Sequence, residues 1–216
     1  SPDEKSVILS VLKEADRTYT NAACIDLEKG TLQVITDPSK EGSLDGTYVL
    51  FPWYDENTAY FVSDQTGYPN VYSYNRKNGR TTRITTNESS LSVDWIEVDG
   101  RKYLFGIANN PAQTTVSIID PLNGVVIANE HYQVTLGIKT TVDNKAYLGA
   151  GATDIPFQLW VMTFDGKNLT KEIVVDLPQE KKDKMIASTT ERVTIPTFDI
   201  DPKTGETRQL HAYILT

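Results

Sequence analysis

The chain has 216 residues and an acidic balance, with 29 Asp and Glu against 21 Lys and Arg and a formal net charge of −8. The sequence contains no block of Lys and Arg. The composition therefore argues against a nucleic-acid partner, because binding one requires clustered cations that neutralise its phosphates. A hydrophobic fraction of 39% is typical of a folded domain. No apolar run approaches the roughly 20 residues of a membrane span.

Cysteine and histidine are scarce. The single cysteine, Cys24, excludes an internal disulfide and a cysteine-based zinc site, and we expect it to be a small buried hydrophobe. We predict no catalytic, cofactor-binding or metal-binding residue and no cofactor, and we assign no substrate-binding residue. Residues 1–5 are polar and carry no targeting signal. The compartment is therefore left open, with the periplasm or secretion favoured over the cytoplasm.

Two landmarks repeat along the chain, at a period of about 45 residues. The first is an acidic turn before an apolar strand, and its leading aspartates lie 52, 44 and 44 residues apart. The second is an apolar strand followed by Asp or Asn and a short loop to Gly, and its glycines lie 49, 45 and 42 residues apart. The landmark residues are Asp3, Asp55, Asp99 and Asp143, then Gly30, Gly79, Gly124 and Gly166. Tight turns need the positive φ that Gly, Asn and Asp supply, so each unit should consist of antiparallel hairpins.

Between the turns, apolar and polar residues alternate and β-branched and aromatic residues are enriched, which predicts short strands. The predicted strands are 48–53, 59–63, 70–74 and 81–85, then 92–97, 102–107, 115–119 and 125–128, then 134–140, 145–150, 157–163 and 170–175. The first unit starts at the turn that the others reach after one strand, so it should lack its innermost strand. Four strands per repeat predict an all-β fold, a partial β-propeller of about four four-stranded antiparallel blades over residues 1–176.

The pattern changes after the blades. Residues 177–190 are highly charged and predict a linker or a short solvated helix. Residues 191–216 predict a C-terminal hairpin that matches no blade. Its turn, 199–206, resembles a calcium loop only superficially, because Pro202 and Lys203 interrupt the oxygen ligands and the loop is too short.

We expect the two histidines and the three tryptophans to have structural roles. His131 is expected in a loop between the third and fourth units, without a nearby Ser or Cys nucleophile, and His211 on the face of the last strand. Trp53, Trp95 and Trp160 are expected within strands at related places of different units, packing between blades rather than forming a cofactor platform.

Several segments carry a resemblance to a known family. Residues 63–75 (SDQTGYPNVYSYN), followed by Gly79 and by Ile84 within an Arg-Ile-Thr run, resemble a blade of the prolyl-oligopeptidase family of serine peptidases. The dipeptidyl-peptidase and acylaminoacyl-peptidase branches are the most similar. Residues 155–161 resemble a strand of a later blade. Residues 191–216 resemble the segment by which that family's chain leaves the propeller and enters its α/β-hydrolase domain.

The resemblance implies a non-catalytic, substrate-gating propeller region of a serine peptidase that hydrolyses peptides. Its partners would be the C-terminal α/β-hydrolase domain of the same parent chain and peptide substrates. The family's Gly-x-Ser-x-Gly elbow is not found in this sequence, where the nearest stretch, 42–46, has the wrong spacing. Neither a catalytic residue nor the paired glutamates of dipeptidyl peptidases can be matched, so this truncated chain alone is expected to be inactive.

Two alternatives remain open. One is a stand-alone propeller that serves as a protein-interaction or periplasmic binding module. The other is a propeller hydrolase or lyase with its own active site, which two histidines disfavour. Because the family's propellers have more than four blades, the open edges are expected to form a homodimer or to be closed by a terminal strand.

Overall fold

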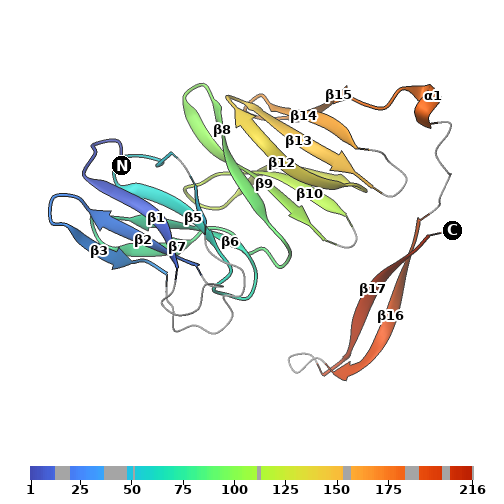
Figure 1. Cartoon of the computed structure of the whole chain (residues 1–216), viewed down its shortest axis with the longest axis horizontal. Coiled ribbons are helices and arrows are strands. Elements are labelled where there is room, and N and C mark those ends of the chain that lie inside the picture. Colours follow the sequence, from blue (N-terminus) through green and yellow to red (C-terminus); the bar gives the residue numbers. More distant parts are fainter. Residues whose placement is uncertain are drawn as a thin grey trace.

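The computed structural model describes residues 1–12, 20–36, 48–50, 52–110, 113–152, 157–182, 190–200 and 205–215. In these ranges the chain forms four antiparallel sheets that follow one another along the sequence, and a separate two-stranded hairpin (Figure 1). We call the four sheets blades 1 to 4 in chain order. The predicted all-β propeller fold is confirmed.

Blades 2, 3 and 4 are four-stranded meanders in which strands adjacent in sequence are adjacent in the sheet. Blade 1 has three strands in the described part of the chain. Its strands are β1 (Ser6–Leu12), β2 (Thr20–Asp26) and β3 (Thr31–Val34). Blade 2 consists of β4 (Tyr48–Leu50), β5 (Thr58–Ser63), β6 (Asn70–Asn75) and β7 (Arg80–Arg83). Blade 3 consists of β8 (Ser92–Val98), β9 (Arg101–Asn109), β10 (Thr114–Ile119) and β11 (Val126–Tyr132), and blade 4 of β12 (Thr135–Val142), β13 (Lys145–Gly151), β14 (Gln158–Phe164) and β15 (Leu169–Val175).

All strands predicted for blades 2 to 4 are present, but two local predictions are wrong. His131 does not lie in a loop, because β11 continues past the predicted end and pairs His131 with Thr115 of β10. Trp53 does not lie in a strand, because β4 ends at Leu50. The tryptophans therefore do not occupy related places, since Trp95 is in the first strand of its blade and Trp160 in the third strand of its blade.

The turns explain both repeated landmarks. In the second landmark, a side-chain oxygen accepts backbone N–H groups two and three residues further on, as Asp165 Oδ1 does from Lys167 (2.8 Å) and Asn168 (2.6 Å). In the first landmark, Asp99 and Asp143 have φ of 50° and 51° at the tight turns that join β8 to β9 and β12 to β13. Asp tolerates this left-handed backbone better than most residues, which is why the repeat carries it.

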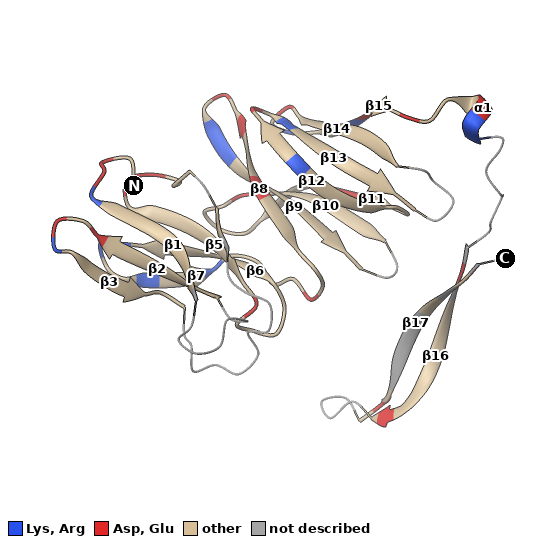
Figure 2. Ribbon diagram, viewed as in Figure 1, with Lys and Arg blue, Asp and Glu red and all other residues tan. Residues whose placement is uncertain are grey.

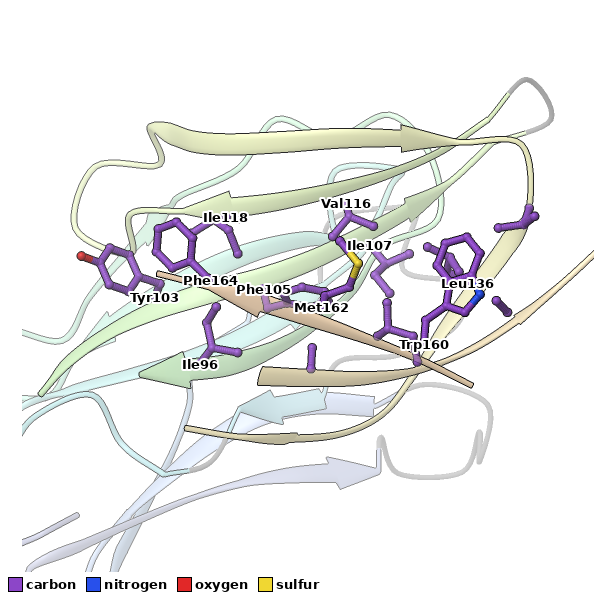
Figure 3. Packing of buried hydrophobic residues seen from close by; sticks show 14 residues of the cluster. Ile96, Tyr103, Phe105, Ile107, Val116, Ile118, Leu136, Trp160, Met162 and Phe164 are labelled. Carbon is purple, nitrogen blue, oxygen red and sulfur yellow. The ribbon is translucent and has the colours of Figure 1, made fainter. Parts of the chain in front are cut away.

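The core lies between blades. Ile8 and Cys24 of blade 1 pack with Trp53 and Phe61 of blade 2, which confirms that Cys24 is a buried hydrophobe. A second cluster joins blades 2 and 3 and contains Trp95. The largest cluster joins blades 3 and 4, where strands β9 and β10 face β13 and β14 (Figure 3). Its labelled members include Tyr103, Phe105, Ile107, Val116, Ile118, Trp160, Met162 and Phe164. The tryptophans pack between blades, as predicted.

The remaining elements follow blade 4. A short helix, α1 (Gln179–Lys182), lies in the charged segment, and β16 (Thr190–Ile200) pairs with β17 (Thr207–Leu215). Figure 1 shows this hairpin apart from the blades. Within the described ranges neither of its strands joins blade 1, so the expected closure by a terminal strand is not observed there.

Replacing Phe105 by alanine tests the interblade core. Phe105 is fully buried between blades 3 and 4, so Phe105→Ala should lower the free energy of unfolding by about 3–5 kcal/mol through lost transfer energy and an unfilled cavity. Urea unfolding followed by tryptophan fluorescence measures the loss. Leu122→Ala, at a side chain that is 64% exposed, is the control and should change stability by less than about 0.5 kcal/mol. Equal effects of the two variants would contradict this packing.

Candidate functional site

In the part of the chain that the structure describes, two hollows lie between neighbouring blades. The first, the blade 1–2 pocket, has a volume of about 460 Å³. Its buried lining comes from Ser6 and Cys24 of blade 1 and Tyr74 of blade 2. Its charged lining comprises Lys5, Asp26, Glu28, Lys29, Arg76 and Lys77. Both its volume and that of the second hollow fall in the range of small-ligand sites.

Most charges of the blade 1–2 pocket are paired with one another. Arg76 reaches from blade 2 to blade 1, where it forms an ion pair with Asp3 and donates a hydrogen bond to Ser6 Oγ (3.1 Å). Lys29 Nζ lies 2.9 Å from Asp26 Oδ2. The Arg76 guanidinium lowers the pKa of Asp3, and burial raises the pKa of the Cys24 thiol. A thiol with a raised pKa stays protonated near neutral pH and is a poor nucleophile.

The second hollow, the blade 2–3 slot, has a volume of about 330 Å³. It lies between the segment that leads from β7 to β8 and the blade 2 side of β9, β10 and β11. Ile84, Leu91, Ile119 and Val126 provide its apolar lining, and Thr85, Asn87, Ser89, Thr115 and Ser117 provide most of the hydroxyl and amide groups. No charged or aromatic side chain is among the described residues that line it.

Asn70 holds one wall of the slot in place. Its side chain is 1% exposed and uses both ends of its amide. Oδ1 accepts hydrogen bonds from Asn87 N (2.6 Å) and Thr85 Oγ1 (2.9 Å), while Nδ2 donates to the carbonyls of Tyr68 (3.0 Å) and Asn87 (3.1 Å). A fully satisfied buried amide of this kind rigidifies the segment it binds. The sequence analysis gave Asn70 no role. A position-by-position comparison of the blades could have indicated the slot, because Thr115 and Ser117 occupy positions where blade 4 has Trp160 and Met162.

The tight turns gather acidic residues at one end of the blades. In a meander, the turn after the first strand and the turn after the third strand leave the sheet at the same end. Figure 2 shows Asp and Glu concentrated at these turns. The acidic turn residues are Asp3, Glu4, Asp26, Glu28, Asp55, Glu56, Asp99, Asp120, Asp143 and Asp165. Lys5, Lys29, Arg76, Lys77 and Lys167 lie in the same turns, so these turns account for only part of the net charge of −8.

The residues that the sequence analysis considered for catalysis or metal binding do not form a common site. His131 is exposed on β11, where its Nδ1 lies 3.0 Å from Thr115 Oγ1 and 3.2 Å from Gln113 Nε2. His211 lies in β17 opposite Thr194 of β16, in the hairpin and not in a blade. In the predicted hairpin turn, Asp199 and Ile200 belong to β16, and residues 201–204 lie outside the described residues. The described part of the chain holds no cluster of three His, Cys, Asp or Glu side chains suited to a metal ion.

Among the described residues, no helix combines the length and apolarity required to traverse a bilayer. Comparison of the sequence with protein families and with curated proteins gives no match.

Solved structures do match the fold. The whole chain superposes on 32% of the length of puromycin hydrolase, with a TM-score of 0.66 and 13% identity. TolB from Acinetobacter baumannii matches 82% of this chain over 42% of its own length, with a TM-score of 0.52 and 19% identity. The chain therefore spans less than half of either protein. At these identities the likeness shows the β-propeller fold alone.

The ion pair between Asp3 and Arg76 predicts an acid-dependent contact between blades 1 and 2. Because the pKa of Asp3 is lowered in the folded chain, its contribution is fully present above the ordinary pKa of 3.8 and is lost as the pH falls below that value. Asp3→Asn should lower the melting temperature at pH 7 and weaken its decline below about pH 4. Calorimetry between pH 2 and pH 7 measures both effects. Glu172→Gln, on an exposed part of β15, is the control and should keep the pH dependence of the melting temperature of the parent chain. If Asp3→Asn also kept that pH dependence, the ion pair would not join the blades.

Proposed function

We propose that the chain is a non-catalytic, substrate-gating propeller region of a prolyl-oligopeptidase-type serine peptidase, as its resemblance to the dipeptidyl-peptidase and acylaminoacyl-peptidase branches suggests. The observation that carries the proposal is the match of the entire chain to about one third of a larger protein named as a hydrolase. The order of elements supports it, since four blades are followed by a charged segment and a hairpin. In this role the blades cover an active site on another domain and admit only short or unfolded peptides.

The topology of blade 4 suggests where the catalytic domain would lie. β15 runs from the acidic turn at Asp165 toward the opposite end of the blade, so residues after Val175 leave the sheet away from the acidic turns. An α/β-hydrolase domain of the same parent chain would then follow on that end, with the acidic turns facing solvent.

A stand-alone propeller that binds a protein or another ligand is the second candidate. The match to TolB over 82% of the chain favours it. The two proposals differ in what the source gene encodes after Thr216. Continuation into a Gly-x-Ser-x-Gly domain supports the peptidase, and a stop codon supports the binding module.

The chain by itself is expected to cleave no peptide, because its sequence contains no nucleophile elbow. Proline- and alanine-containing dipeptidyl and acyl-peptide chromogenic substrates measure this directly. The matched control is the longer parent chain that the proposal requires, which should release the chromophore. The proposal would be contradicted if the 216-residue chain cleaved these substrates and a serine-directed inhibitor abolished the cleavage.

We also propose that the isolated chain forms a homodimer through the outer faces of blades 1 and 4. Strand alternation turns Val7, Leu32 and Val34 away from the cluster that joins blades 1 and 2, and Val175 likewise away from blade 3. The ring of Phe157, directly before β14, lies beside Gly149 of β13, which alternates with the buried Leu148 and Ala150. These five side chains are between 41% and 63% exposed. A two-fold axis would set each blade 1 face against the partner's blade 4 face and close a ring.

Light scattering coupled to gel filtration measures the assembly. The parent chain should run as a dimer, and Leu32→Glu should shift it to a monomer, because a buried unpaired carboxylate opposes association. Leu122→Glu adds the same charge in the turn between β10 and β11 and should remain dimeric. A monomeric parent chain contradicts the dimer.

A further inference from the structure

We propose that the blade 2–3 slot is a binding site for an uncharged peptide segment with small aliphatic side chains. It is distinct from the blade 1–2 pocket, where most charged side chains are already paired, either with one another or, for Arg76, with Asp3. The proposal of a binding site is argued from the shape and the chemistry of the slot alone. The further statement, that the bound peptide is part of a substrate passing the blades, rests on the proposed function.

The slot exists because blade 3 presents small side chains where blade 4 presents large ones. Counted back from the aspartate of the following turn, Thr115 and Ser117 of β10 match Trp160 and Met162 of β14. Trp160 and Met162 fill the space between blades 3 and 4. At the matching places between blades 2 and 3, Thr115 and Ser117 leave a hollow of about 330 Å³.

The chemistry of the lining selects the class of ligand. Burying a charged group without a partner is costly, and the described lining offers no charged side chain, so anions and cations are disfavoured. Nucleobases and other flat rings usually stack on aromatic side chains, and none lines the slot. A polyol would place hydroxyl groups against Ile84, Leu91 and Ile119. A peptide supplies both the amide groups that Asn, Ser and Thr can hydrogen-bond and the small aliphatic groups that these apolar residues can cover.

The slot is preorganised from both sides. Asn70 fixes the segment that carries Thr85 and Asn87 through three hydrogen bonds. On the other side, Gly124 has a φ of +74° and approaches the carbonyl of Ile84 so closely that a Cβ atom would overlap it. A wall that is already ordered costs less entropy when a ligand binds, which raises the affinity of the site.

The test is a titration of the 216-residue chain with N-acetyl-alanyl-valyl-alanine amide, followed by amide NMR. Shifts are expected at Asn87, Ser117 and their neighbours in the slot. Ser117→Met places in blade 3 the side chain that blade 4 uses at the matching position, and it should weaken binding by about tenfold or more. Ala108→Leu fills the slot from β9 and serves if Ser117→Met does not fold. Thr170→Met, on exposed β15, is the matched control and should bind like the parent chain.

Two further probes test the ligand class. The corresponding peptide with aspartate in place of both alanines, and the disaccharide trehalose, should bind at least about tenfold more weakly. Equal binding of either probe, shifts confined to residues outside the slot, or full affinity in a folded slot-filling variant would overturn the proposal. The titration needs no hydrolase domain, so its failure leaves the peptidase proposal standing, and a stop codon after Thr216 leaves the slot standing.

Discussion

Each blade of this protein buries its apolar side chains against a neighbouring blade, because a single sheet has two faces and no interior. The three clusters that join successive blades contain all three tryptophans. One blade therefore contributes alternate residues of the same strand to two different clusters, as Leu104 and Phe105 of β9 do. Stability, the slot and the uncovered outer faces of blades 1 and 4 all follow from this arrangement.

The same arrangement explains why the hollows lie between blades. A wedge between two twisted sheets is filled only if both present side chains of sufficient volume. Between blades 3 and 4, Trp160 and Met162 supply that volume, whereas between blades 2 and 3 the matching positions are Thr115 and Ser117. A repeat protein can thus create a hollow between two blades by carrying smaller side chains at two positions of one repeat, while the turns and strands keep their pattern.

Much of the fold was predictable because it depends on neighbours in sequence. Asx turns such as that of Asp165, the positive φ of Asp99 and the alternation along β14 are local, and the strands of blades 2 to 4 were predicted to within a few residues. His131 was misplaced because β11 is an edge strand with mostly exposed side chains, so it lacks the alternation that marks a half-buried strand. Only its pairing with β10 reveals that the strand continues through His131.

The sequence by itself determined the repeat, the strands, the acidic turns and the shortage of groups for acid–base or metal chemistry, since these depend on composition and on contacts within a few residues. The tertiary structure decided which side chains meet across blades. Asp3 and Arg76 are 73 residues apart in the chain, and the blade 2–3 slot combines residues from Ile84 to Val126. Such contacts depend on how one sheet packs against the next, and no local pattern of residues specifies that packing.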